Sequence, residues 1–138
     1  MKSIYLDYNA TTPLDPAVRE AMLPFLGDNF GNPSSIHRVG RKARAFLDAS
    51  RERVAGVWKC KASEVVFTSG ATESINLAIC GTARLLKDKG RHLITSAVEH
   101  HAVLRSFEYL VNKEGFELTT LPVDVDGRVN PQDLENAI

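Results

Sequence analysis

The stretch Val65-Val66-Phe67-Thr68-Ser69-Gly70-Ala71-Thr72-Glu73-Ser74-Ile75-Asn76-Leu77-Ala78 decides how this chain folds. It opens at 65–67 with apolar residues that favour β structure, which predicts a short buried strand. Ser69 and Gly70 then mark a turn. One helical stripe follows, made of Ile75, Ala78, Ile79, Thr82, Leu85 and Leu86. The sequence therefore predicts a strand, a turn and a helix that starts near Ala71.

The predicted helix start is a candidate anion site. The first N–H groups of a helix have no partner within it, and the helix dipole favours negative charge there. Gly70 lets a phosphate approach the backbone, while Thr72 and Ser74 add hydroxyl donors. Glu73 supports a second interpretation, because its carboxylate could occupy the same positive end as a cap. From the residues alone, a phosphate site and an ordinary capped turn both stay open.

The turn does not match the common nucleotide-binding patterns. It lacks Gly-x-x-x-x-Gly-Lys-Ser/Thr, and no lysine follows to reach a second or third phosphate. The dinucleotide pattern Gly-x-Gly-x-x-Gly is also absent. What remains suits a single phosphate, such as that of pyridoxal 5′-phosphate.

Composition points to an ordinary globular domain. The 138 residues are 43% hydrophobic and 25% charged, with 17 basic and 17 acidic side chains. This balance gives no reason to expect binding to nucleic acid or to a membrane. No apolar run approaches the roughly 20 residues that span a bilayer. Two cysteines without a CxxC pattern suggest a reducing compartment, so we expect a cytoplasmic protein.

The order of the predicted elements indicates an α/β fold. Strands are expected at 3–6, 65–67, 92–96 and 116–123, and helices at about 15–25, 36–57, 71–86, 102–112 and from 130 onward. Alternating strands and helices favour a mostly parallel sheet with right-handed crossovers. The segments 69–72 and 96–101 both follow predicted strands, so they should share one edge of the sheet. The last helix is cut short at Ile138, which we interpret as the mark of a fragment.

The histidines and cysteines give weaker signals. His100 and His101 are adjacent, so on a helix they cannot chelate one metal, and no metal site is expected. His100 follows a strand near the candidate anion site, which suits proton transfer or stacking on a planar ligand. Capping a helix start is the simpler alternative for it. Cys60 looks like a surface thiol and Cys80 like a core residue.

Four motifs together resemble one known family, the NifS/IscS-type cysteine desulfurases. They are residues 5–13 (Tyr-Leu-Asp-Tyr-Asn-Ala-Thr-Thr-Pro), 30–35 (Phe-Gly-Asn-Pro-Ser-Ser) with His37 and Gly40, 66–74 with 76–78, and Thr95-Ser96 with Glu99-His100 and 102–104. They occur in the family's order and cover nearly the whole chain. The resemblance implies a fold-type I, class V enzyme that uses pyridoxal 5′-phosphate to take sulfur from L-cysteine and release L-alanine.

The resemblance also implies roles for individual residues. Ala71 would hold the cofactor phosphate through its backbone N–H, and Thr72 through its hydroxyl. His100 would lie over the pyridine ring and take part in proton transfer. Ala10 and Thr11 would border the substrate pocket. The loop at Asn32 would lie near the active-site entrance or a dimer interface.

The chain resembles only about the first third of such an enzyme. The family's cofactor lysine, its aspartate at the pyridine nitrogen, its substrate arginine and its persulfide cysteine would all lie beyond residue 138. We therefore expect part of one transferase domain, with an N-terminal arm, helix and loop at 1–35 and a helix plus βαβαβ unit at 36–138. The isolated chain should be inactive. The resemblance further implies a homodimer and an iron–sulfur scaffold or other sulfur acceptor as partner.

Three other interpretations stay open. One is another class V enzyme, such as a selenocysteine lyase or an aminotransferase. The second is a non-catalytic truncated fragment or binding module, which should expose sheet edges and apolar surface. The third is a generic phosphate- or nucleotide-binding domain that uses the same helix start.

Overall fold

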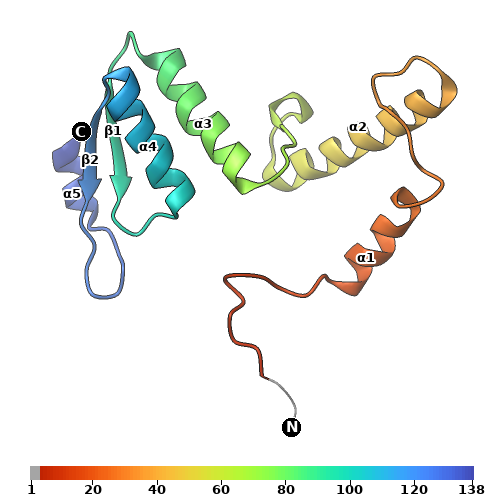
Figure 1. The fold of residues 1–138 in the computed structure, drawn as a ribbon, viewed down its shortest axis with the longest axis horizontal. Helices are drawn as coiled ribbons and strands as arrows, with labels where there is room; N and C mark the ends of the chain where they lie inside the picture. The colour runs from red at the N-terminus through yellow and green to blue at the C-terminus, as the bar shows by residue number, and fades with distance from the viewer. Residues whose placement is uncertain (1–3) are drawn as a thin grey trace. The chain divides into compact units, whose positions relative to one another are not determined.

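The computed structural model describes residues 4–138, which form two compact units joined in sequence at Val66 and Phe67. In chain order the elements are α1 (Pro16–Met22), η1 (Leu23–Phe25), α2 (Arg38–Trp58), η2 (Ala62–Glu64), α3 (Ala71–Leu86), β1 (His92–Ser96), α4 (His101–Glu114), β2 (Glu117–Leu121) and α5 (Pro131–Ala137) (Figure 1). The first unit holds the elements up to η2, and the second holds the rest. The division expected from the sequence, at 35 and 36, remains a prediction about the whole protein.

Helices α1 and α2 each begin after a residue whose side chain caps the helix start. The side chain of Asp15 accepts a hydrogen bond from the N–H of Ala17 at 2.8 Å, and Pro16 occupies the first helical position. His37 caps α2 in a similar way, because its Nδ1 accepts from the N–H of Gly40 at 3.3 Å. The expected helices at about 15–25 and 36–57 are therefore confirmed, with α2 shifted by one or two residues.

The loop at 30–35 packs tightly on the start of α2. A Cβ atom added at Gly40 would lie 2.4 Å from the carbonyl oxygen of Ser35 and 2.7 Å from that of Asn32. Gly31 has φ +147, and a Cβ there would meet Val39 at 2.9 Å. Glycine is therefore required at both positions for this loop to lie against the helix.

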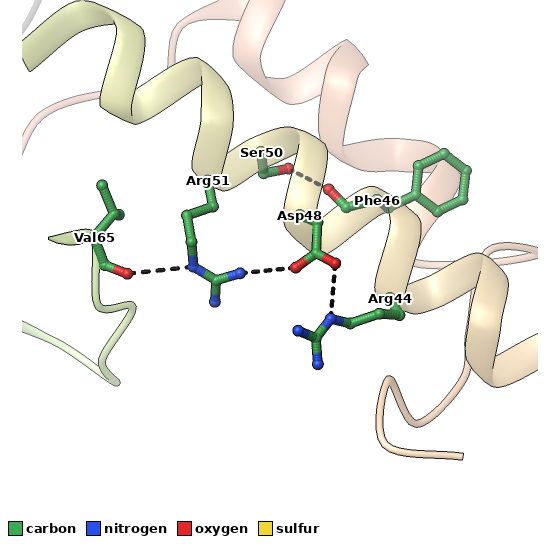
Figure 2. A network of polar contacts seen from close by, with 6 residues as sticks. All are labelled: Arg44, Phe46, Asp48, Ser50, Arg51 and Val65. Atoms are coloured by element: carbon green, nitrogen blue, oxygen red, sulfur yellow. Dashed lines mark hydrogen bonds and ion pairs between the residues drawn. The ribbon is translucent and has the colours of Figure 1, made fainter. Parts of the chain in front are cut away.

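A polar network ties the far end of the first unit to α2. Figure 2 shows Asp48 between two arginines: the Nε of Arg44 donates at 2.8 Å and the Nη1 of Arg51 at 2.9 Å. The Nε of Arg51 also donates to the carbonyl oxygen of Val65 at 3.2 Å. Arg51 thereby holds the chain that leaves η2 against the side of α2.

The second unit is a small α/β assembly. β1 and β2 pair in parallel, with Leu93 opposite Leu118 and Ser96 opposite Leu121. Figure 1 shows α3 and α4 side by side next to these strands. The core between them contains Cys80, Ala83, Leu110 and Phe116, and Leu110 is completely buried. Burying one such leucine contributes about 1.5–3 kcal/mol, so this small cluster organises the unit. The expected α/β class with parallel strands is confirmed.

Two predicted strands are not formed in the part of the chain that the structure describes. Residues 4–6 and 65–67 carry no strand assignment, and Ser3 lies outside the described residues. Val66 is 64% exposed and Phe67 is 45% exposed, so the apolar run at 65–67 is not buried either. A strand requires a neighbouring strand to share its backbone hydrogen bonds, and residues 4–138 contain one two-stranded sheet, β1–β2. The expectation of a βαβαβ unit is wrong in its first strand.

Two further predicted elements differ from the observed ones only in their end residues. β2 ends at Leu121 rather than 123, since Pro122 has no N–H to donate to a ladder. Helix α4 starts at His101 and ends at Glu114, because Gly115, with φ +70, caps it in the left-handed conformation. Among residues 4–138, none of the helices combines the length and the apolar character that crossing a bilayer requires.

Candidate functional site

The start of α3 has the open backbone that an anion site needs. The first helical hydrogen bond joins the N–H of Ser74 to the carbonyl oxygen of Gly70 at 3.1 Å. The N–H groups of Ala71, Thr72 and Glu73 therefore precede the first bond within the helix. Gly70 is the capping residue, and within the described chain no side chain caps this helix start. The donors and the positive end of the helix dipole are left facing outward.

Glu73 does not cap these donors. Its Oε2 accepts from the backbone N–H of Ser69 at 2.7 Å and from the Oγ of Ser69 at 2.7 Å. The hydrogen bond from the Ser69 hydroxyl, and to a smaller extent that from its backbone N–H, lowers the pKa of Glu73 below its ordinary value of 4.5. The carboxylate is thus charged at neutral pH and bonded to Ser69, the residue that precedes Gly70. The alternative in which Glu73 simply fills the helix start is not what the structure shows.

The turn itself is fixed by short hydroxyl contacts. The Oγ1 of Thr68 donates to the carbonyl oxygen of Gly70 at 3.1 Å and lies 2.6 Å from the Oγ of Ser74. Residues on both sides of Gly70 are therefore linked to each other. These contacts restrain the turn around Gly70.

His100 caps the neighbouring helix. Its Nδ1 accepts from the N–H of Ala102 at 3.1 Å, which satisfies one of the free donors at the start of α4. In a neutral imidazole the proton then sits on Nε2. The simpler role considered for His100 is therefore real. It leaves Nε2, the atom on the other side of the ring, available to a ligand.

Thr72 and His100 line the same hollow. It is open to solvent, has a volume of about 480 Å³ and is bordered by Thr72, Asn76, His100, His101, Ala102, Arg105, Ser106 and Tyr109. Segments 69–72 and 96–101 do not share a sheet edge as expected, but Thr72 and His100 from these segments still line one hollow. They do so although the strand predicted before Ser69 is not formed, because α3 and α4 pack directly on each other.

The other predicted site residues lie in the first unit. The N–H groups of Ala10 and Thr11 donate to the carbonyl oxygen of Asp7 at 3.1 Å and 3.4 Å. The Oδ1 of Asn32 accepts from the N–H of Ser34 at 2.9 Å and shapes its loop. Their roles at a substrate pocket or an entrance remain predictions, and so do the roles of Ala71, Thr72 and His100 toward a cofactor.

Sequence reasoning missed Asn76. Its Nδ2 donates to the carbonyl oxygen of Thr72 at 2.9 Å, and its side chain lines the hollow beside Thr72. The signal was available, since residues four apart lie on the same face of a helix. In the part of the chain that is described, no group of three or more histidine, cysteine or acidic side chains could hold a metal ion.

Comparison with known proteins identifies the family. Residues 4–138 match the family described as aminotransferase class-V. The chain belongs to this family. Members of this family depend on pyridoxal 5′-phosphate.

The similar proteins are cysteine desulfurases. The chain is 54% identical over 137 residues to the cysteine desulfurase IscS of Dictyoglomus turgidum and 48% identical over 137 residues to that of Methanosarcina thermophila. Each match covers 99% of this chain and 34% of the relative, in its N-terminal part. The chain therefore spans about a third of the length of these relatives.

Solved structures of similar proteins contain the same fold. A NifS-like protein superimposes with a TM-score of 0.90 at 40% identity, over 98% of this chain and 37% of that one. A structure described as SspA in complex with cysteine gives a TM-score of 0.88 at 40% identity, over 99% of this chain and 39% of that one. The recognition of the NifS/IscS type from four motifs is confirmed.

Proposed function

We propose that this chain is part of a pyridoxal 5′-phosphate-dependent cysteine desulfurase, which removes sulfur from L-cysteine to give L-alanine and an enzyme persulfide. The observation that carries the proposal is that Thr72 and His100 line one hollow beside a helix start with open N–H groups. The names of the relatives and the cysteine bound in the SspA structure support the substrate. Because the chain spans about a third of those relatives, the activity, a homodimer and an iron–sulfur scaffold or other sulfur acceptor are parts of the same proposal.

The residues present fit a phosphate monoester. A phosphate offers several acceptor oxygens and about two negative charges, which match outward N–H groups and a positive helix end. Ala71 and Thr72 supply the backbone donors, and the exposed hydroxyl of Thr72 supplies another. Glu73 is held away by Ser69, so it leaves these donors to the ligand. Ala71 and Thr72 together would fix the phosphate end of the cofactor.

The chemistry of the reaction divides between the cofactor and this chain. When bound, pyridoxal 5′-phosphate supplies an electron sink for negative charge that develops on a substrate carbon. The chain's part is to hold the phosphate at α3 and to present a proton-transfer group beside it. His100 suits that second task, because its Nδ1 is occupied by Ala102 and its Nε2 can donate or accept a proton. The cap on α4 also fixes the direction of the ring.

Loss of the Thr72 hydroxyl should weaken phosphate binding selectively. We would measure the Kd of the chain for pyridoxamine 5′-phosphate and for pyridoxamine, neither of which condenses with lysine side chains. The phosphate compound should bind more tightly, and Thr72→Ala should weaken it by about tenfold, the size of one hydrogen bond to a charged group. Thr82→Ala, an exposed threonine on the same helix, should leave both Kd values unchanged. Equal affinity of the wild-type chain for both compounds would contradict the proposal.

The isolated chain should not turn over cysteine. The family resemblance implies that the cofactor lysine, the substrate arginine and the persulfide cysteine would all lie beyond residue 138. Cys60 is exposed and Cys80 lies in the core, and neither lines the hollow of Thr72 and His100. The check is alanine release from cysteine in the presence of pyridoxal 5′-phosphate. A rate above that of the free cofactor would show that the expectation is wrong.

A further inference from the structure

The acidic residue at the start of α3, Glu73, lies where a phosphate would bind. Glu73 lies in the first turn of a helix whose positive end would receive a phosphate, and like charges repel. If the carboxylate only repelled the ligand, this position would weaken the proposed site. The contacts of Glu73 give a different answer.

Both short hydrogen bonds of Glu73 go to one residue outside the helix. Its Oε2 lies 2.7 Å from the backbone nitrogen of Ser69 and 2.7 Å from the Oγ of the same residue. Hydrogen bonds that a carboxylate accepts from N–H and O–H donors are stronger than those between neutral groups. They join the first turn of α3 to the residue that precedes Gly70.

We propose that Glu73 is a positioning residue, which holds Ser69 and Gly70 in the conformation that keeps the N–H groups of Ala71 and Thr72 open to the cofactor phosphate. This inference rests on the proposed function and assigns a part of the same site. Gly70 gives the helix no side-chain cap, so the turn depends on links such as this one. The pKa of Glu73 is lowered by Ser69, so the link is made by the charged form at neutral pH.

The proposal separates the hydrogen-bonding role of Glu73 from its charge. Glu73→Gln removes the charge but keeps a side-chain oxygen that can accept both bonds from Ser69. Glu73→Ala removes the acceptor as well. If Glu73 is a positioning residue, Glu73→Ala should weaken phosphate binding and Glu73→Gln should nearly preserve it. If Glu73 only repels the ligand, both changes should tighten phosphate binding.

The chain offers a matched control in its first unit. The Oε2 of Glu64 accepts from the backbone N–H of Lys61 at 2.7 Å, which is the same kind of bond at the start of η2. Glu64→Ala removes a carboxylate-to-backbone bond of equal length in the first unit. Any effect that is specific to Glu73 must exceed the effect of this control.

The experiment is a titration of the full chain and its variants with pyridoxamine 5′-phosphate and with pyridoxamine. Glu73→Ala should weaken binding of the phosphate compound by about tenfold, Glu73→Gln by less than about threefold, and Glu64→Ala should have no effect. Pyridoxamine, which lacks the phosphate, should bind the wild-type chain and all of its variants alike. Ser69→Ala, which removes one of the two bonds, should fall between wild type and Glu73→Ala.

Two outcomes would overturn the inference and can be told apart. If the wild-type chain prefers the phosphate compound but Glu73→Ala binds it equally well or more tightly, Glu73 has no positioning role and the proposed function stands. If the wild-type chain shows no preference for the phosphate compound, the proposed function fails and this inference fails with it. Rescue of Glu73→Ala by glutamine at the same position is the result that supports the inference.

Discussion

Single residues in this chain serve structure and the candidate site together. The Nδ1 of His100 caps α4, and such a cap contributes about 1 kcal/mol. The same bond leaves Nε2 for a ligand in the hollow shared with Thr72. From the sequence, a cap and a proton-transfer role were alternatives for His100. The structure shows that one does not exclude the other, because they use different nitrogens of the ring.

Gly40 should tolerate no side chain. A Cβ at this position would lie 2.6 Å from the Cβ of Ser35 and closer still to its carbonyl oxygen. We expect Gly40→Ala to lower the free energy of unfolding by about 1–3 kcal/mol, the usual cost of overpacking. The measurement is urea unfolding followed by circular dichroism.

Gly56 is the control for Gly40 on the same helix. A Cβ there would meet nothing within 4 Å, and alanine favours helix over glycine. Gly56→Ala should therefore raise the free energy of unfolding by about 0.5–1 kcal/mol. If Gly40→Ala were also stabilising, the close packing of the loop at 30–35 on α2 would be contradicted.

At the scale of elements, helix starts could be predicted from the sequence more reliably than the pairing of strands. The helix starts at Asp15 and Asn130 could be predicted because each cap acts on N–H groups two or three residues away. β1 and β2 could be predicted because each is a short stretch of leucine, isoleucine and threonine, with the sequences HLITS and ELTTL. The run Val65-Val66-Phe67 also consists of residues that favour strands, but it has no strand beside it in residues 4–138. Composition cannot reveal whether a partner strand is present, so that prediction failed.

The pair of helices α3 and α4 is joined by a salt bridge that should respond to pH. The guanidinium of Arg84 donates to both carboxylate oxygens of Glu114, with a shortest distance of 2.6 Å. The bond from Arg84 is the main cause that lowers the pKa of Glu114 from 4.5. A carboxylate whose pKa is lower in the folded state stabilises that state above its unfolded pKa. This contribution is lost as the pH falls through the folded value, below 4.5.

Glu114→Gln should therefore remove part of the acid sensitivity of the chain. The thermal unfolding midpoint of the wild-type chain should fall more steeply between pH 6 and pH values below 4.5 than that of the variant. Glu117→Gln, at an exposed carboxylate on β2, should behave like wild type. Identical pH profiles for wild type and Glu114→Gln would show that the salt bridge does not contribute.

At the scale of the whole molecule, much apolar surface is exposed. The large side chains that are at least three-quarters exposed include Ile4, Leu6, Leu26, Ile36, Val57, Trp58, Leu85, Val125 and Ile138. Extensive exposed apolar surface favours association. We expect the chain to self-associate as its concentration rises, which sedimentation velocity can measure. A monodisperse monomer with a cooperative thermal transition at high concentration would contradict this expectation.

The central claim is that the start of α3 binds the phosphate of a cofactor. The most direct test is to follow backbone amide resonances by nuclear magnetic resonance during titration with pyridoxamine 5′-phosphate. The account predicts that the amides of Ala71, Thr72 and Glu73 shift together with the ring resonances of His100, and that pyridoxamine leaves the three amides unmoved. If the phosphate compound shifts other residues and leaves these three amides where they were, the helix start is not the site and the account is wrong.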